Sequence, residues 1–212
     1  MSSARTYIHT FSDSLERSHS LNNESDWIAF YKRIWPELLT VVRVDKYSTV
    51  QTRGVDRMIW LPNGKQIMVD EKCREKDYGD IALEVTSVGR TVNGMFVEEK
   101  PGWVVDDSKI CDFVAYAIPS AGKCYMLPFQ LLQAAVYMNF TEWKKNKQCK
   151  WPVDSKNCDK NGNYLYTTRN IGVPWCVLKS ALNEQMHRKF GSDVELPKAE
   201  QVRSLDQLEF NW

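Results

Sequence analysis

The sequence Gly-Val-Asp-Arg-Met-Ile-Trp-Leu-Pro-Asn-Gly-Lys-Gln-Ile-Met-Val-Asp-Glu-Lys, residues 54–72, contains two apolar runs separated by a turn signal. The signal is Pro62-Asn63-Gly64, and Asn-Gly between two strand-forming runs is the strongest short-range indication of a hairpin. We therefore predict a hairpin of two strands, one over 50–61 and the next over 65–74.

Strand geometry then determines which side chains of this hairpin share a face. Residues two apart lie on the same face, so Asp70 and Lys72 point one way while Val69 and Glu71 point the other. If the turn pairs the strands, Asp56 and Asp70 can face each other. Two adjacent carboxylates repel unless a cation lies between them, and a hard divalent ion prefers oxygen ligands. A lysine beside that ion can hold a phosphate or orient water, as metal-assisted phosphodiester hydrolysis requires.

The rest of the chain supplies further helices and strands. Apolar residues recur at three- and four-residue spacing from Trp27 to Trp35, which predicts an amphipathic helix that Pro36 ends. Together the elements predict an α/β fold, with a central mixed β-sheet flanked by helices. We predict helices over 25–35, 129–138 and 173–190, strands over 40–44, 80–88, 112–118 and 123–127, and an irregular excursion over 89–110.

The arrangement of Asp56, Asp70 and Lys72 resembles the PD-(D/E)XK nuclease superfamily. That superfamily, which includes restriction endonucleases, Holliday-junction resolvases and phage exonucleases, carries an Asp near the end of one strand and (Asp/Glu)-x-Lys on the next. Val55 stands where the superfamily's name has Pro. The helix over 25–35 also matches the start of the superfamily's helix–strand–strand–strand–helix–strand core. The resemblance therefore implies a restriction-endonuclease-like core, with these three residues in the catalytic positions.

This resemblance implies a divalent-metal-dependent nuclease, with DNA favoured over RNA as the substrate. Mg²⁺ would lie between Asp56 and Asp70, with Mn²⁺ able to substitute, and Lys72 would position the attacking water. Glu84 lies on an apolar strand, where an unpaired carboxylate is costly to bury, so it is a candidate third acid and metal ligand. Thr86 stands where many such nucleases have a second lysine. A homodimer is one arrangement that the resemblance suggests.

Three other interpretations compete with this one. Asp70 and Lys72 could be an ion pair on a solvated surface. The fold could also persist as a catalytically inactive module that binds nucleic acid or protein. Finally, Cys149, Cys158 and His187 could hold zinc, although metal-ligand cysteines usually come in close pairs.

The charge distribution bears on the choice of partner. The formal net charge of +1 argues against nucleic acid when taken alone, yet residues 141–190 carry ten Lys and Arg against four acids. Aromatic residues interleave with these bases, as in surfaces that follow a nucleic-acid backbone, although a solubilising loop has the same composition. The weaker candidates for substrate contacts are Gln51, Arg74, Lys144, Lys145 and Lys147.

The domain organisation follows from these segments. We predict an N-terminal polar segment over 1–24, a nuclease-like core over 25–140, a basic helical and loop extension of the same domain over 141–190, and an acidic tail over 191–212. The first 20 residues contain no apolar block of the kind found in secretory signals, and no apolar run is long enough to span a membrane. A cytoplasmic protein with reduced cysteines is therefore expected.

Overall fold

The computed structural model describes residues 5–10, 24–46 and 48–191, which fall into two compact units. We call one the hairpin unit, made of the described residues within 24–77, 108–130 and 190–191. The other, the long-strand unit, is made of residues 5–10, 78–107 and 131–189. Each unit is thus built from separate stretches of the chain.

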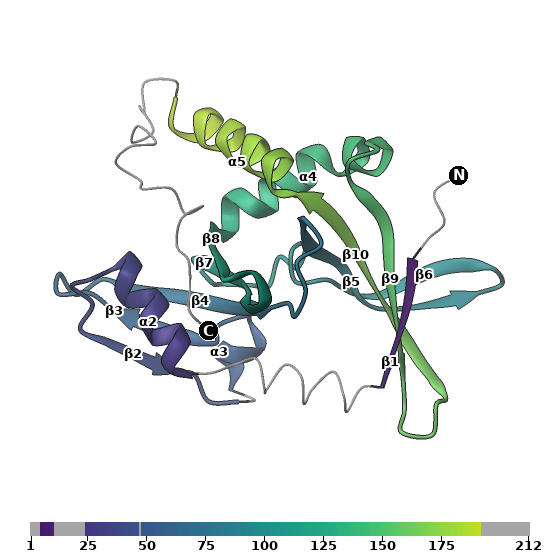
Figure 1. Cartoon of the computed structure of the whole chain (residues 1–212), viewed down its shortest axis with the longest axis horizontal. Helices are drawn as coiled ribbons and strands as arrows, with labels where there is room; N and C mark the ends of the chain where they lie inside the picture. The colour runs from purple at the N-terminus through teal and green to yellow at the C-terminus, as the bar shows by residue number, and fades with distance from the viewer. Residues whose placement is uncertain (1–4, 11–23, 47, 192–212) are drawn as a thin grey trace. The chain divides into compact units, whose positions relative to one another are not determined.

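The hairpin unit contains a five-stranded mixed sheet with one helix on a face (Figure 1). The strand order is β2-β3-β4-β7-β8, and only β4 and β7 run parallel to each other. The elements are α2 (Glu24–Ile34), β2 (Thr40–Arg43), α3 (Thr49–Thr52), β3 (Arg57–Trp60), β4 (Gln66–Cys73), β7 (Phe113–Ile118), η1 (Pro119–Ala121) and β8 (Lys123–Pro128).

The core of the hairpin unit lies between α2 and the sheet. Trp27, Phe30 and Tyr31 of α2 are fully buried, as their helical spacing predicts, and they pack against a face that includes Ile59 and Val69. The rings of Trp27 and Tyr31 stack with centroids 6.1 Å apart. Burying side chains of this size contributes about 2 kcal/mol each, so this face holds α2 in place.

The predicted hairpin is confirmed. β3 and β4 pair antiparallel from Arg57 opposite Val69 to Trp60 opposite Gln66. Gly64 adopts φ +77°, and its N–H donates to the carbonyl of Leu61 at 3.0 Å. The turn therefore uses the left-handed conformation that glycine tolerates best.

The strand expected over 50–61 is correct only in its second half. Thr49–Thr52 forms the short helix α3, which begins at Ser48, whose Oγ accepts a hydrogen bond from the N–H of Gln51. Gly54 then reverses the chain with φ +79° before β3 begins. The N-cap Ser and the left-handed glycine outweigh the β-branched residues that favour a strand here.

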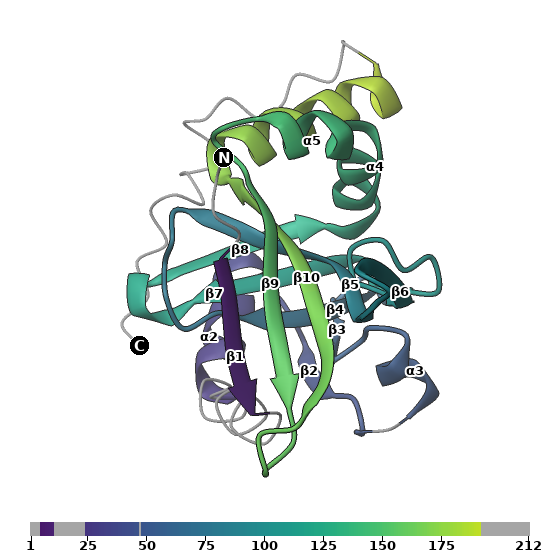
Figure 2. The same ribbon diagram turned by 90° about the vertical axis from the view of Figure 1, so that its right-hand side faces the viewer.

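The long-strand unit contains a second five-stranded sheet, in the order β1-β9-β10-β5-β6 (Figure 2). β1 and β9 are parallel, and the other pairs are antiparallel. The elements are β1 (Arg5–Thr10), β5 (Asp80–Val92), β6 (Met95–Pro101), α4 (Phe129–Lys145), which begins in the hairpin unit, β9 (Lys150–Cys158), β10 (Tyr164–Pro174) and α5 (Trp175–Phe190).

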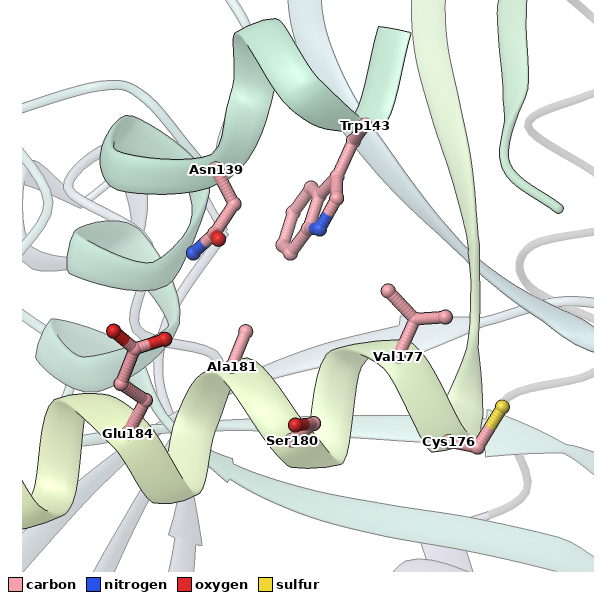
Figure 3. A pocket seen from close by; sticks show the side chains of 7 residues that line it. All are labelled: Asn139, Trp143, Cys176, Val177, Ser180, Ala181 and Glu184. Carbon is pink, nitrogen blue, oxygen red and sulfur yellow. The ribbon is translucent and has the colours of Figure 1, made fainter. Parts of the chain in front are cut away.

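Helices α4 and α5 pack side by side, and a hollow of about 350 Å³ lies between them (Figure 3). Trp143 of α4 is 4% exposed and points toward Val177 and Ala181 of α5. Ala181 lines this hollow. Cys176 lines the rim of the same hollow and is exposed.

The structure changes the predicted domain organisation. The stretch 25–140 is divided between the two units, because the chain leaves the hairpin unit after Asp77 and returns at Ser108. The excursion expected over 89–110 contains the end of β5 and all of β6, and the basic segment 141–190 contains β9 and β10. Residues 5–10 of the polar N-terminal segment form β1, and the acidic tail from residue 192 lies outside the described residues. No helix among the described residues is long and apolar enough to cross a membrane.

A buried ion-pair network ties α2, β3 and β4 together. Arg57, which is 2% exposed, donates from Nε to Glu71 at 3.0 Å and from Nη1 to Glu24 at 2.8 Å. The hydroxyl of Tyr31 donates to the same Glu71 oxygen at 2.8 Å. Burial raises the pKa of Glu71, while Arg57 and Tyr31 act to lower it. A buried carboxylate with this many donors is stable only while its partners remain.

We expect Arg57→Met to destabilise the protein by about 3 kcal/mol, because it leaves Glu71 buried without its cation. The measurement is the urea unfolding midpoint at neutral pH. Lys123→Met is the matched control, since Lys123 pairs with Asp77 at 2.9 Å and its side chain is 51% exposed. The control should shift stability by less than about 1 kcal/mol, and equal shifts for both variants would contradict the assigned role of Arg57.

Candidate active site

Asp56 is held rigidly at the start of β3. Its N–H donates to the carbonyl of Val69 at 2.8 Å, and its carbonyl accepts from the N–H of Val44 at 2.9 Å. Its carboxylate oxygen Oδ2 accepts from the N–H of Glu71, also at 2.8 Å. The side chain of Asp56 therefore lies over β4 beside the Asp70-Glu71 peptide.

Asp70 lies on β4 and is buried, with 2% of the residue exposed. Burial raises the pKa of Asp70 to about 7, with Lys72 acting to lower it and Asp56 acting to raise it by charge and by a hydrogen bond. Lys72 Nζ lies 2.5 Å from Asp70 Oδ1, and the Lys72 side chain is 29% exposed. The structure thus brings Asp56, Asp70 and Lys72 together, with a buried acid that holds a proton near neutral pH.

Gly54 permits a second lysine to approach this cluster. A Cβ on Gly54 would lie 2.7 Å from Cδ of Lys109 and 3.6 Å from Oδ2 of Asp70. Lys109 Nζ donates to the carbonyl of Thr52 at 3.2 Å. Lys109 was not among the residues predicted from the sequence. The only feature that could have indicated it was Gly54, two residues before Asp56.

Cys111 completes the surroundings of the cluster. Its thiol is buried, and burial raises its pKa to about 12, with the charge of Asp70 adding to the effect and those of Lys72 and Lys109 opposing it. A thiol with this pKa stays protonated at neutral pH, and Mg²⁺ prefers oxygen ligands to sulfur. The oxygen atoms of the two carboxylates are therefore the ionic ligands that the cluster offers.

Glu84 belongs to the other unit. It lies on β5 opposite Asn170 of β10, and its charge raises the pKa of Tyr166 after the larger effect of burial. The carbonyl of Glu84 accepts from the N–H of Val104 at 3.3 Å. The role of Glu84 as a third acid stays a prediction.

The weaker candidates are divided between the units. Gln51 lies in α3, and Arg74 follows β4, where its N–H donates to the carbonyl of Ala117 at 2.9 Å. Lys144 and Lys145 end α4, and Lys147 is exposed just beyond it. The first two thus belong to the hairpin unit with the carboxylates, and the three lysines to the long-strand unit.

Two of the competing interpretations do not fit the structure. Asp70 is buried, so the Asp70–Lys72 pair is not a solvated surface pair. Cys149 and Cys158 lie at opposite ends of β9, about 30 Å apart at the rise of an extended strand, so they cannot share a zinc ion. Among the described residues, no group of three or more His, Cys, Asp or Glu is placed to hold a metal. None of the six cysteines, all of them described, forms a disulfide.

Comparisons with protein-family models, curated proteins and solved structures find no match for this chain. The candidate site therefore rests on its own geometry.

The raised pKa of Asp70 makes a stability prediction. The folded protein binds the Asp70 proton more tightly than the unfolded chain does, so the carboxylate lowers stability as pH rises from about 4 to about 7. Asp70→Asn removes this cost, and we expect it to raise the free energy of unfolding by about 2 kcal/mol more at pH 8 than at pH 5.

Thermal unfolding at the two pH values, without divalent ions, measures this difference. Asp77→Asn is the control, because Asp77 forms a more exposed ion pair with Lys123 in the same unit. If Asp70→Asn raises the free energy of unfolding by the same amount at both pH values, Asp70 does not hold its proton near neutral pH.

Proposed function

We propose that this protein is a divalent-metal-dependent nuclease that hydrolyses phosphodiester bonds, with DNA as the favoured substrate. The observation that carries the proposal is the contact between Asp56 and buried Asp70, with Lys72 on the same carboxylate. Two acids this close keep one proton or one cation between them.

The donor set suits Mg²⁺, with Mn²⁺ as a substitute. Mg²⁺ is commonly bound by one or two carboxylates while it keeps several waters, so Asp56 and Asp70 suffice without a larger acidic cage. Bound there, the ion would supply Lewis acidity and lower the pKa of a coordinated water. Glu84 remains a proposed further acid, and Asp56 and Asp70 are the two residues that would hold the ion.

The cations of the site have separate proposed roles. The Lys72 ammonium is partly exposed and reaches Asp70, so the same flexible side chain can reach a phosphate and offset the charge that develops on it. Lys109 lies on the Gly54 side of Asp70 and adds positive charge that favours a bound phosphodiester. In this proposal the two carboxylates bind the metal ion, and the two lysines bind the phosphate.

The architecture of the hairpin unit supports a restriction-endonuclease-like core. Helix α2 precedes the three antiparallel strands β2, β3 and β4, and β7 then runs parallel to β4. Asp56 lies just before the second of these strands, and Asp70 and Lys72 lie on the third. The superfamily's core has a helix between its third and fourth strands. In this chain, residues 78–107 of the long-strand unit lie between β4 and β7 in the sequence instead.

The ion pair between Lys72 and Asp70 also supports the second candidate, a catalytically inactive module that binds nucleic acid or protein. In such a module the ammonium group would neutralise Asp70 permanently, and no metal would be needed. The two candidates differ in whether a divalent ion displaces Lys72 from the carboxylate.

The nuclease proposal predicts Mg²⁺-dependent cleavage by the purified full-length protein. Linear, circular and branched DNA and RNA form the substrate panel, analysed on denaturing gels. Asp70→Asn and Lys72→Met should lower the cleavage rate by about a hundredfold or more, because each removes a group that acts on the transition state. Asp77→Asn and Lys123→Met, which change a similar ion pair away from the site, should leave the rate unchanged.

Cleavage that survives in Asp70→Asn or in excess EDTA would overturn the proposal. Cleavage absent from every substrate, with the variants folded, would favour the binding module.

Metal binding provides an independent prediction. Because a divalent ion must displace the Asp70 proton, we expect Mn²⁺ affinity to rise as pH increases from 6 to 8 and each binding event to release a proton below about pH 7. Isothermal titration in buffers of different ionisation enthalpy measures both quantities. Asp56→Asn should abolish the binding, whereas pH-independent affinity would show that Mn²⁺ does not occupy this pair.

A further inference from the structure

The long-strand unit contains a pocket of about 430 Å³. All the residues that line this pocket belong to the long-strand unit, whereas Asp56 and Asp70 belong to the hairpin unit. Strands β5 and β6, helix α4 and strands β9 and β10 all contribute to its lining. Its volume is within the range of pockets that bind small organic groups. The pocket is therefore large enough to take a ligand.

Aromatic rings form much of the pocket lining. Phe140 and Trp151 meet edge to face with ring centroids 5.0 Å apart, and Tyr137 and Phe96 add two further rings. Tyr137 is 54% exposed, and its single hydroxyl proton is shared between the carbonyl oxygen of Val105 at 2.9 Å and Oδ1 of Asp107 at 3.0 Å. An open aromatic lining of this kind accepts a flat ring by stacking.

The guanidinium of Arg169 is a planar cation in the lining of the same pocket. The guanidinium of Arg169 lies 3.6 Å from the ring centroid of Phe96. Asp154 holds it in that plane by accepting from Nε at 2.7 Å and from Nη2 at 2.8 Å. An arginine held by a bidentate carboxylate loses little further entropy when another planar group stacks on it.

Positive charge also lies over the aromatic rings. The ammonium of Lys144 is 4.6 Å from the ring centroid of Phe140 and 5.9 Å from that of Trp151. Lys144 is exposed, so its charge is available to a phosphate near the pocket. A stacking wall with an adjacent cation is the combination that single-stranded nucleic acid requires.

One acid, Glu98, lines the pocket and is exposed. Glu98 Oε2 accepts a hydrogen bond from the hydroxyl of Thr86 at 2.6 Å, and Thr86 itself is 3% exposed. A carboxylate fixed in this way accepts hydrogen bonds from a ligand and repels a carbonyl oxygen. Carboxylates recognise the exocyclic amino group of cytosine in this manner.

We propose that this pocket binds one unstacked base of a single-stranded nucleic acid, with Glu98 selecting bases that carry an exocyclic amino group. Trp151 stacks on the base, the nearly perpendicular ring of Phe140 meets the base edge to face, and Lys144 contacts the adjacent phosphate. All of these residues belong to the long-strand unit, so the inference goes beyond the proposed nuclease function and does not depend on a metal.

Fluorescein-labelled hexanucleotides of deoxycytidine and deoxyuridine test this proposal by anisotropy with the full-length protein. The titrations contain EDTA, so neither cleavage nor metal binding contributes, and loss of nuclease activity leaves this result unaffected. We expect deoxycytidine hexanucleotide to bind at least about fivefold more tightly than deoxyuridine hexanucleotide. Equal affinity for the two, or no binding of either at low salt, would overturn the proposal.

Variants of residues in and beside the pocket test whether the difference in affinity between the two hexanucleotides arises there. Glu98→Gln should bring the affinity ratio close to one, whereas Glu99→Gln should keep it, because the neighbouring Glu99 pairs with Arg90 at 3.2 Å and does not line the pocket. Trp151→Ala should weaken both hexanucleotides about tenfold or more. Trp151→Phe keeps an aromatic ring and should restore most of this loss, which separates stacking from a folding defect. A ratio that survives Glu98→Gln would contradict the assignment of Glu98.

Discussion

The ion pair between Arg57 and Glu71 is the interaction on which the candidate site depends. Both side chains are buried on the α2 face of the sheet, where Tyr31 adds a third partner. A shift of β4 by one residue would move Glu71 off this face and leave Arg57 without its carboxylate, at a cost of several kcal/mol. The network therefore fixes the register of β3 and β4, and this register places Asp70 beside Asp56 on the opposite face.

The proximity of Asp56 and Asp70 is unfavourable in itself. Burial and like charge both disfavour an ionised Asp70, so the fold must stabilise this face from elsewhere. The aromatic packing of α2 and the Glu71 network supply that stabilisation on the other side of the sheet. An acid placed this unfavourably is typical of sites that bind a cation or a proton in order to function.

Features encoded by local sequence could be predicted. The turn at Pro62-Asn63-Gly64 determined the hairpin, and the spacing of Trp27, Phe30 and Tyr31 determined α2 and its buried face. The alternation of side chains along β4 then separated Asp70 from Glu71. These predictions succeeded because each depends on residues close together in the chain.

Features that depend on distant pairing were missed. β9 has no clear apolar alternation, and it forms a strand because β1 and β10 pair with its two edges. The division into two units depends on where the chain crosses between them, which no composition change marks. Lys109 joins the cluster only because Gly54, far away in the sequence, leaves room for it. Each of these results from contacts that sequence patterns do not record.

The nuclease proposal requires that Asp56 and Asp70 share a divalent ion. Anomalous diffraction from a crystal of the protein soaked in Mn²⁺ tests it most directly. We predict one manganese peak in contact with both carboxylates, with the Lys72 ammonium moved away from Asp70. A crystal without manganese at this pair, in which Lys72 keeps its contact with Asp70, would contradict it.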